Sequence, residues 1–184
     1  GQSATLRLEA EVTPSGGAGP FTNTATASAE SPSATPLQDT DAAQLSLPVI
    51  GLAKEVIAGP TSNDDGTFTV DLELVVENLG REDLVDVRVI DDLSATFPAP
   101  ASVVSVSPPV ATITGGMGAL SANTAYDGLV DTDLLVAAVS GLDVGASGRI
   151  TMEVTFDPNG LPGPFFNQST ASGSPPGGGT VSDL

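Results

Sequence analysis

The chain has 184 residues, with 23 Asp or Glu against only five Lys or Arg, and its net charge is −18. This acidic excess excludes nucleic-acid binding, which needs Lys and Arg to neutralise phosphates, and it disfavours anionic membranes for the same reason. Cys and His are absent, so zinc sites, thiol nucleophiles and Ser-His-Asp catalysis lose their usual residues, and we predict that the protein is not an enzyme.

The composition also indicates strands. Apolar residues make up 40% of the chain but aromatic residues only 4%, so the core must consist of Val, Leu, Ile and Ala, of which the β-branched residues favour strands. Twenty-one Gly and 15 Pro interrupt the apolar runs and predict turns. No apolar run approaches the roughly 18 residues that span a bilayer, so we expect no membrane insertion. No signal-peptide pattern is present, and we expect the chain to be an excerpt of a longer protein.

Four segments alternate apolar and polar residues, which is typical of antiparallel strands with one buried face. In chain order their apolar positions are Leu6, Leu8, Ala10 and Val12; Phe68, Val70, Leu72, Leu74 and Val76; Val85, Val87 and Val89; and Ile150, Met152, Val154 and Phe156. Turn-forming stretches at 61–67, 77–83 and 158–164 separate them. We predict an all-β fold, an immunoglobulin-like antiparallel β-sandwich over 48–184, in which the Gly-rich region 107–132 forms a long loop or short edge strands.

The first 40 residues align with the last 40 without a gap, at an offset of 144. Fourteen of the forty pairs are identical, among them Gly19/Gly163, Pro20/Pro164, Phe21/Phe165, Asn23/Asn167, Ala27/Ala171 and Asp39/Asp183. Composition alone rarely produces an ungapped register, so we interpret the match as a tandem repeat with a period of 144. Residues 1–47 are then the C-terminal part of a preceding repeat and 48–184 one nearly complete repeat, with the boundary near Pro48.

Residues 1–47 would carry the last strands of a repeat whose first strands are not in this sequence. Their inward side chains are predicted to include Leu6, Leu8, Val12 and Phe21. Each such side chain gains roughly 1.5–3 kcal/mol on burial, and unpaired strand edges recruit other chains. We therefore predict that residues 1–30 pair with a neighbouring copy, or with the preceding repeat, in an end-to-end fibre.

Five segments follow one another in a layout that resembles the DUF11-type repeats of bacterial and archaeal surface proteins. They are GLAKEV, TFTVDLELVVENLG, LVDVRVIDDL, VGASGRITMEVTF and GPFFNQSTASG. The pattern V-x-N-x-G is present at 76–80, whereas the D-x-L-P element reads Asp92-Leu93-Ser94 and lacks its proline. The resemblance covers 48–184 and part of 1–47. It implies an extracellular, immunoglobulin-like module strung in arrays on adhesins, stalks and cell-surface fibres.

Related modules of Gram-positive pilins and collagen adhesins form a Lys–Asn isopeptide bond that a buried acid promotes. Lys54, Asp91 and Asn167 stand in the corresponding order, and strand parity puts each on an inward face, where an unpaired polar group would be costly. A buried, neutral Lys amine could attack the Asn amide while the acid polarises the carbonyl and ammonia leaves. The alternative is a hydrogen-bonded polar cluster in which Lys54 snorkels at a strand end. Both interpretations remain open.

Acidic residues in the predicted loops are candidate ligands for Ca²⁺, which would be the only cofactor. They are Asp127, Asp131 and Asp133 in one loop, and Asp39 and Asp41 near the junction between repeats, where calcium would stiffen an array. The other interpretation is that these carboxylates are simply solvated.

We therefore expect a structural repeat of a secreted cell-surface adhesin or extracellular filament, acting as a spacer or fibre-building unit. The alternative function is a calcium-dependent glycan- or protein-binding adhesin module that uses the loops around 107–133. Glycan sites usually offer exposed aromatic platforms, and Tyr126 is the one such residue in these loops.

Overall fold

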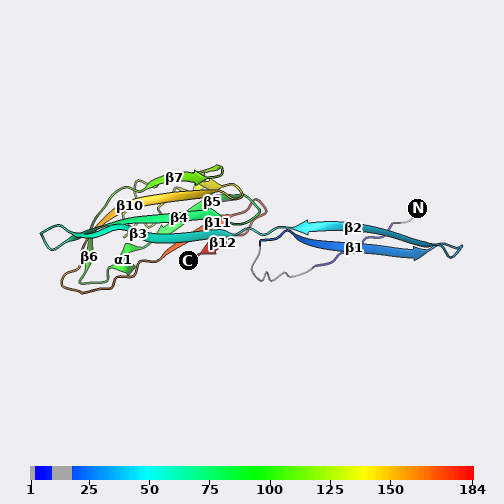
Figure 1. The fold of residues 1–184 in the computed structure, drawn as a ribbon, viewed down its shortest axis with the longest axis horizontal. Coiled ribbons are helices and arrows are strands. Elements are labelled where there is room, and N and C mark those ends of the chain that lie inside the picture. Colours follow the sequence, from blue (N-terminus) through cyan, green and yellow to red (C-terminus); the bar gives the residue numbers. More distant parts are fainter. Residues whose placement is uncertain (1–2, 10–17) are drawn as a thin grey trace.

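The computed structural model describes residues 3–9 and 18–184, and nearly all of its regular structure is antiparallel β-sheet (Figure 1). The strands are β1 (Phe21–Glu30), β2 (Pro36–Leu45), β3 (Ile50–Ser62), β4 (Phe68–Asn78), β5 (Leu84–Asp91), β6 (Ser102–Val106), β7 (Val110–Gly115), β8 (Gly118–Ala119), β9 (Gly141–Leu142), β10 (Ser147–Asp157), β11 (Ser169–Ser174) and β12 (Val181–Asp183). In the described part of the chain, helix is limited to the short α1 (Leu93–Thr96) and the 3-10 turn η1 (Ala137–Val139), and no helix is long and apolar enough to cross a membrane. The prediction of an all-β chain is confirmed.

Two five-stranded sheets share one hydrophobic core. The first has the order β3-β4-β10-β6, with β7 also pairing β10, and the second has the order β12-β11-β5-β9-β8. The buried core positions on the longer strands are Val70, Leu72, Leu74 and Val76 of β4, Ile150, Met152, Val154 and Phe156 of β10, and Val87 and Val89 of β5. These are inward positions that the period-two alternation predicted for β4, β10 and the second half of β5.

The alternation predicted for β5 is wrong at its first position. The Val85 side chain is exposed, and the neighbouring Leu84 is buried in its place. Asp86 has a φ of +52°, and the pairing of β5 with β11 shifts its register between Ser172 and Ser174. This bulge reverses the direction of the side chains by one residue, so that Leu84 enters the core.

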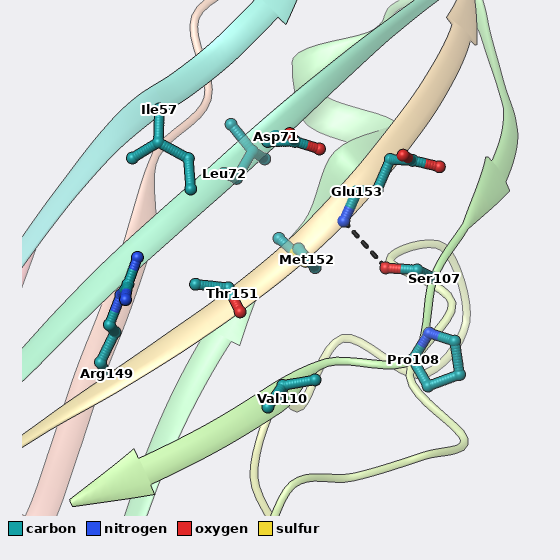
Figure 2. Close-up of a pocket in the computed structure, with 10 residues that line it drawn as sticks. All are labelled: Ile57, Asp71, Leu72, Ser107, Pro108, Val110, Arg149, Thr151, Met152 and Glu153. Atoms are coloured by element: carbon teal, nitrogen blue, oxygen red, sulfur yellow. Dashed lines mark hydrogen bonds between the residues drawn. The ribbon is translucent and has the colours of Figure 1, made fainter.

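The Gly-rich region contains both of the structures that its sequence allowed. β7 and β8 are short strands at sheet edges, and a loop then runs to β9. In the segment between β6 and β7, the Ser107 N–H donates to the Glu153 carbonyl oxygen (2.9 Å). The Ser107 Oγ accepts from the Glu153 N–H (2.8 Å). Figure 2 shows the contact between Ser107 and Glu153 beside a groove along β10, which Asp71 and Arg149 also line.

β1 and β2 form a separate hairpin that projects lengthwise beyond the other two sheets (Figure 1). All of their side chains are exposed. Residues 3–9 form no strand, so the alternation predicted there is wrong as a strand assignment, because no neighbouring strand supplies the backbone partners that a strand requires. Ala10 and Val12 lie outside the described residues.

The hairpin has the register of β11 and β12. Ala27 lies opposite Asp39 in β1–β2, and Ala171 lies opposite Asp183 in β11–β12, so both partners are displaced by the same 144 positions. Gly19 and Gly163, which precede the two hairpins at equivalent positions, have φ of +88° and +72°. The two aligned sequence segments therefore pair their strands in the same way.

The base of the hairpin is tied to the turn after β4. The Gly80 N–H donates to the Val49 carbonyl (3.1 Å), the Arg81 N–H to the Leu47 carbonyl (3.1 Å), and the Arg81 Nε to the Gly19 carbonyl (2.7 Å). A Cβ at Gly80 would lie only 2.4 Å from the Val49 nitrogen. The glycine of the V-x-N-x-G pattern is therefore needed for the close approach of the segment that joins the hairpin to β3.

Candidate functional site

Lys54, Asp91 and Asn167 meet at one carboxylate between the two sheets. Lys54 lies on β3 of the first sheet, Asp91 ends β5 of the second, and Asn167 precedes β11. The Lys54 Nζ donates to the Asp91 Oδ1 at 2.7 Å, and the Asn167 Nδ2 lies 3.4 Å from the Asp91 Oδ2. Strand parity placed these three side chains on inward faces, and the packing of the sheets brings them together.

Three further side chains complete this group. The Ser169 Oγ accepts from Lys54 (2.9 Å) and donates to the Asp91 Oδ1 (3.0 Å). The Tyr126 hydroxyl donates to the Asp91 carbonyl oxygen (3.2 Å). The Thr96 Oγ1, on α1, donates to the Asn167 Oδ1. We call these six residues the inter-sheet polar cluster; they are Lys54, Asp91, Thr96, Tyr126, Asn167 and Ser169.

Sequence reasoning missed Ser169, Thr96 and the burial of Tyr126. In the alternative function Tyr126 would be the aromatic platform for a glycan, but its side chain is buried. Ser169 shares the strand parity of Asn167 and could have been found from it. Nothing in the local sequence of Thr96 indicates its partner, because its Oγ1 donates to the Asn167 Oδ1 (2.9 Å) across 71 positions of the chain.

Asp91, Thr96, Tyr126 and Ser169 are buried, and Lys54 and Asn167 are partly buried. The exposed fraction of the side chain is 13% for Lys54 and 0% for Asp91. Burial lowers the pKa of the Lys54 ammonium from its ordinary value, and the Asp91 carboxylate opposes that lowering. Every buried side-chain nitrogen and oxygen within the described ranges has a hydrogen-bond partner. Loss of either charged group would therefore leave the other without its main partner in a low dielectric.

Tyr126 should ionise only when the protein unfolds. Burial raises the pKa of its hydroxyl above the ordinary value of 10.0, and the neighbouring Asp91 carboxylate raises it further. Above pH 10 the unfolded chain therefore releases a proton that the folded chain retains, and stability falls as the pH rises. Because this is the sole Tyr, tyrosinate absorbance reports it directly. We expect Tyr126→Phe to abolish that alkaline loss, and absorbance that titrates near pH 10 in the folded protein would contradict the burial.

The geometry of the cluster allows two outcomes. Lys54 and Asp91 can remain an ion pair that links the sheets. Alternatively, a neutral Lys54 amine can attack the carboxamide carbon of Asn167. In that case Thr96, which donates to the Asn167 oxygen, polarises the carbonyl, and Asp91 lies beside the amide nitrogen that departs as ammonia.

The carboxylates proposed for Ca²⁺ have other partners. The Asp127 Oδ1 accepts from the N–H groups of residues 129–131 at 2.8–2.9 Å, and these bonds hold the pKa of Asp127 below its ordinary value. The Asp131 Oδ1 accepts from the Asp133 N–H (3.2 Å), and the Asp133 carboxylate pairs with Arg88. Across residues 3–9 and 18–184, no group of three or more Asp, Glu, His or Cys side chains is placed to hold a metal ion.

Asp39 and Asp41 lie on the exposed hairpin. Both belong to β2, and the segment that joins the hairpin to β3 is 46–49. Each carboxylate accepts from the N–H of the next residue, at 3.0 Å for Asp39 and 2.9 Å for Asp41. The hairpin extends the chain by ten residues on each strand before the junction, which sequence alone did not indicate.

Comparison with protein-family models, with curated proteins and with solved structures found no match for this chain. The resemblance to DUF11-type repeats therefore stays a prediction from the sequence. Three features of the chain bear on its function: the ungapped alignment of its two terminal segments, the equivalent register of the two hairpins, and the inter-sheet polar cluster.

Proposed function

We propose that this chain is a structural module of an extracellular tandem-repeat protein, acting as a spacer or fibre-building unit of a cell-surface adhesin or filament. The observation that carries the proposal is the recurrence of one hairpin, in one register, at an offset of 144 residues. In this proposal each unit is an immunoglobulin-like, DUF11-type β-sandwich with no catalytic role.

The connections between the first and last strands suit a module under tension. In an array, force would enter 48–184 near β3 and leave it near β12. The Leu52 N–H of β3 donates to the Asp183 Oδ2 of β12 (2.8 Å), and Lys54 of β3 bonds to Ser169 of β11 across 115 positions. These contacts hold the two ends of the module to each other, so that stretching must break them before the core opens.

Immunogold labelling of intact cells tests the proposed function. An antibody against 48–184 should decorate the surface, or filaments that leave it, without permeabilisation. Labelling that appears only after the cells are permeabilised would contradict an extracellular structural role. Labelling at the surface as isolated molecules, in the absence of any repeated spacing, would contradict the array.

The cluster further supports an internal Lys54–Asn167 isopeptide bond as a covalent form of the same connection. The new bond joins the Lys54 Nζ to the Asn167 Cγ, and the Asn167 Nδ2 leaves as ammonia with the proton that the amine gives up. Intact-mass measurement of the wild-type chain should then show the loss of one ammonia. Asp91→Ala should restore the unmodified mass, because Asp91 contacts both reacting side chains.

Stretching single molecules between their two ends provides an independent measurement of that bond. With the bond in place, the segment between Lys54 and Asn167 cannot extend when the module unfolds. Lys54→Met should release that length and lower the unfolding force. Full extension of the wild type, together with an unmodified mass, would show that Lys54 and Asp91 remain a non-covalent ion pair.

The alternative, a calcium-dependent binding module, depends on the loop carboxylates. Asp127, Asp131 and Asp133 hydrogen-bond to the loop itself or to Arg88. The groups that would bind a ligand therefore serve to hold the loop, and no contact favours this function over the structural one.

A further inference from the structure

We infer that the β1–β2 hairpin closes the second sheet of another copy of this fold, by pairing β1 with that copy's β5 as β11 pairs with β5 here. The inference rests on the proposed function, since the other copy would be the preceding repeat. To the proposed function it adds which strand of the other copy pairs with β1, in which register, and which side chains come into contact. Residues 1–40 would take, in that copy, the place that residues 145–184 take in this one.

The register follows from the pairing of β11. Ser169 lies opposite Asp91 and Ala171 lies opposite Val89 on β5. An offset of 144 turns these positions of β11 into Ala25 and Ala27 of β1. Because the two hairpins have the same internal register, β1 can replace β11 with β2 still in place at the outer edge, where β12 stands.

The inward face of the hairpin has the side chains of a buried face but is exposed. Ala171 is buried and Val181 packs against the core, whereas their counterparts Ala27 and Leu37 are exposed, Leu37 at 55%. No charged residue occupies the inward positions of β1. They are Phe21, Asn23, Ala25, Ala27 and Ala29, matching Phe165, Asn167, Ser169, Ala171 and Gly173. On β2 the same face carries Asp39 and Asp41, opposite Ala27 and Ala25, and Asp39 is the counterpart of Asp183.

Residues 3–9, whose counterpart lies in β10, support the same partner independently. Leu6 and Leu8 are 96% and 78% exposed, but the equivalent Ile150 and Met152 of β10 are buried and lie opposite β4. The same copy of the fold that accepts β1 next to β5 would accept residues 3–9 next to β4. One partner therefore accounts for both exposed apolar segments.

Asn23 and Asp39 are identical to their counterparts Asn167 and Asp183. Asn23 would enter the cluster formed by the partner copy's Lys54 and Asp91, with Ala25 in the place of Ser169. Asp39, the counterpart of Asp183, would accept from the partner copy's Leu52 N–H. The hairpin cannot do this within its own 48–184 module, because β5 already pairs with β11 on one side and with β9 on the other.

A chain in which residues 48–144 precede Gly1 of the full 184-residue protein tests the inference, because it keeps the period of 144. In hydrogen exchange, we expect the amides of β1 to slow by about 100-fold or more relative to the 184-residue chain, as they gain partners on β5 and cover from water. Unchanged exchange of β1 would overturn the inference, including the case in which the added segment fails to fold against it.

Ala27→Asp and Ser28→Asp form a matched pair of variants. In the 184-residue chain both positions are exposed, so neither should alter unfolding. In the extended chain Ala27 faces the core, as Ala171 does, and Ala27→Asp should abolish the protection of β1, while Ser28→Asp leaves it in place. Equal effects of the two variants would overturn the proposed register. The surface labelling and the mass of 48–184 do not depend on this result, so the proposed function can stand if the inference fails.

Discussion

Asp91→Ala should destabilise the module by about 3–5 kcal/mol, because it leaves the Lys54 ammonium buried without its counter-ion. The Asp91 side chain is fully buried and accepts from Lys54, Ser169 and Tyr126. All of these donors lose an acceptor at once. Urea unfolding at neutral pH, followed by far-UV circular dichroism, measures the change. If the isopeptide bond forms in the wild type, the loss will exceed this range, since the covalent connection disappears as well.

Two variants provide the controls. Arg88→Ala removes an ion pair whose side chains are substantially exposed, and it should cost no more than about 1 kcal/mol. The double variant Lys54→Met, Asp91→Leu replaces both charges by apolar groups and should recover much of the stability that Asp91→Ala loses. If Asp91→Ala costs no more than Arg88→Ala, the cluster does not hold the sheets together.

Asn78→Ala should cost about 2–5 kcal/mol, because it removes the side-chain donor of two carbonyl oxygens and one of the two acceptors of the Gly80 N–H. The buried Asn78 Nδ2 donates to the carbonyl oxygens of Glu82 (2.9 Å) and Leu142 (3.0 Å), and its Oδ1 accepts from the Gly80 N–H (3.0 Å). Thermal unfolding measures the loss. The asparagine of the V-x-N-x-G pattern thus joins β4, the turn that follows it and β9.

Asn78→Asp distinguishes hydrogen bonding from volume. It keeps the shape and the acceptor for Gly80, but it directs a carboxylate oxygen at two carbonyl oxygens, so we expect it to be at least as damaging as Asn78→Ala. Asn63→Ala, in the exposed turn between β3 and β4, removes hydrogen bonds that water can replace and should cost less than about 1 kcal/mol. A mild effect of Asn78→Asp would contradict the donor role of the amide.

Strand parity predicted which side chains face the core wherever a strand is regular. In β4 and β10 the alternation runs without interruption, and the inward residues from Val70 to Val76 and from Ile150 to Phe156 are buried. It was wrong at Val85, because a bulge depends on how β5 pairs with β11 and leaves no period in the sequence. It was also wrong for residues 3–9, because alternation describes a strand only if another strand is available to pair with it.

In the inter-sheet polar cluster, too, strand parity predicted some of the residues and not others. Its Lys54, Asp91 and Asn167 could be named from their inward parity and order. Thr96 and Tyr126 reach it from a short helix and a loop, and their partners lie far along the chain. Which polar groups meet is decided by the spacing and offset of two sheets, and a single strand carries no information about either.

The sequence by itself determined the all-β class, the offset of 144 and the equivalence of the two terminal segments, since periodicity and identity are properties of the chain alone. Only the tertiary structure decided that the β1–β2 hairpin pairs with no strand of the 48–184 module. Backbone groups can pair only where an edge is free, and β5 has none: β11 lies on one side of it and β9 on the other. The hairpin therefore projects with its inward face exposed, although the sequence of β1 matches that of β11, whose inward side chains are buried.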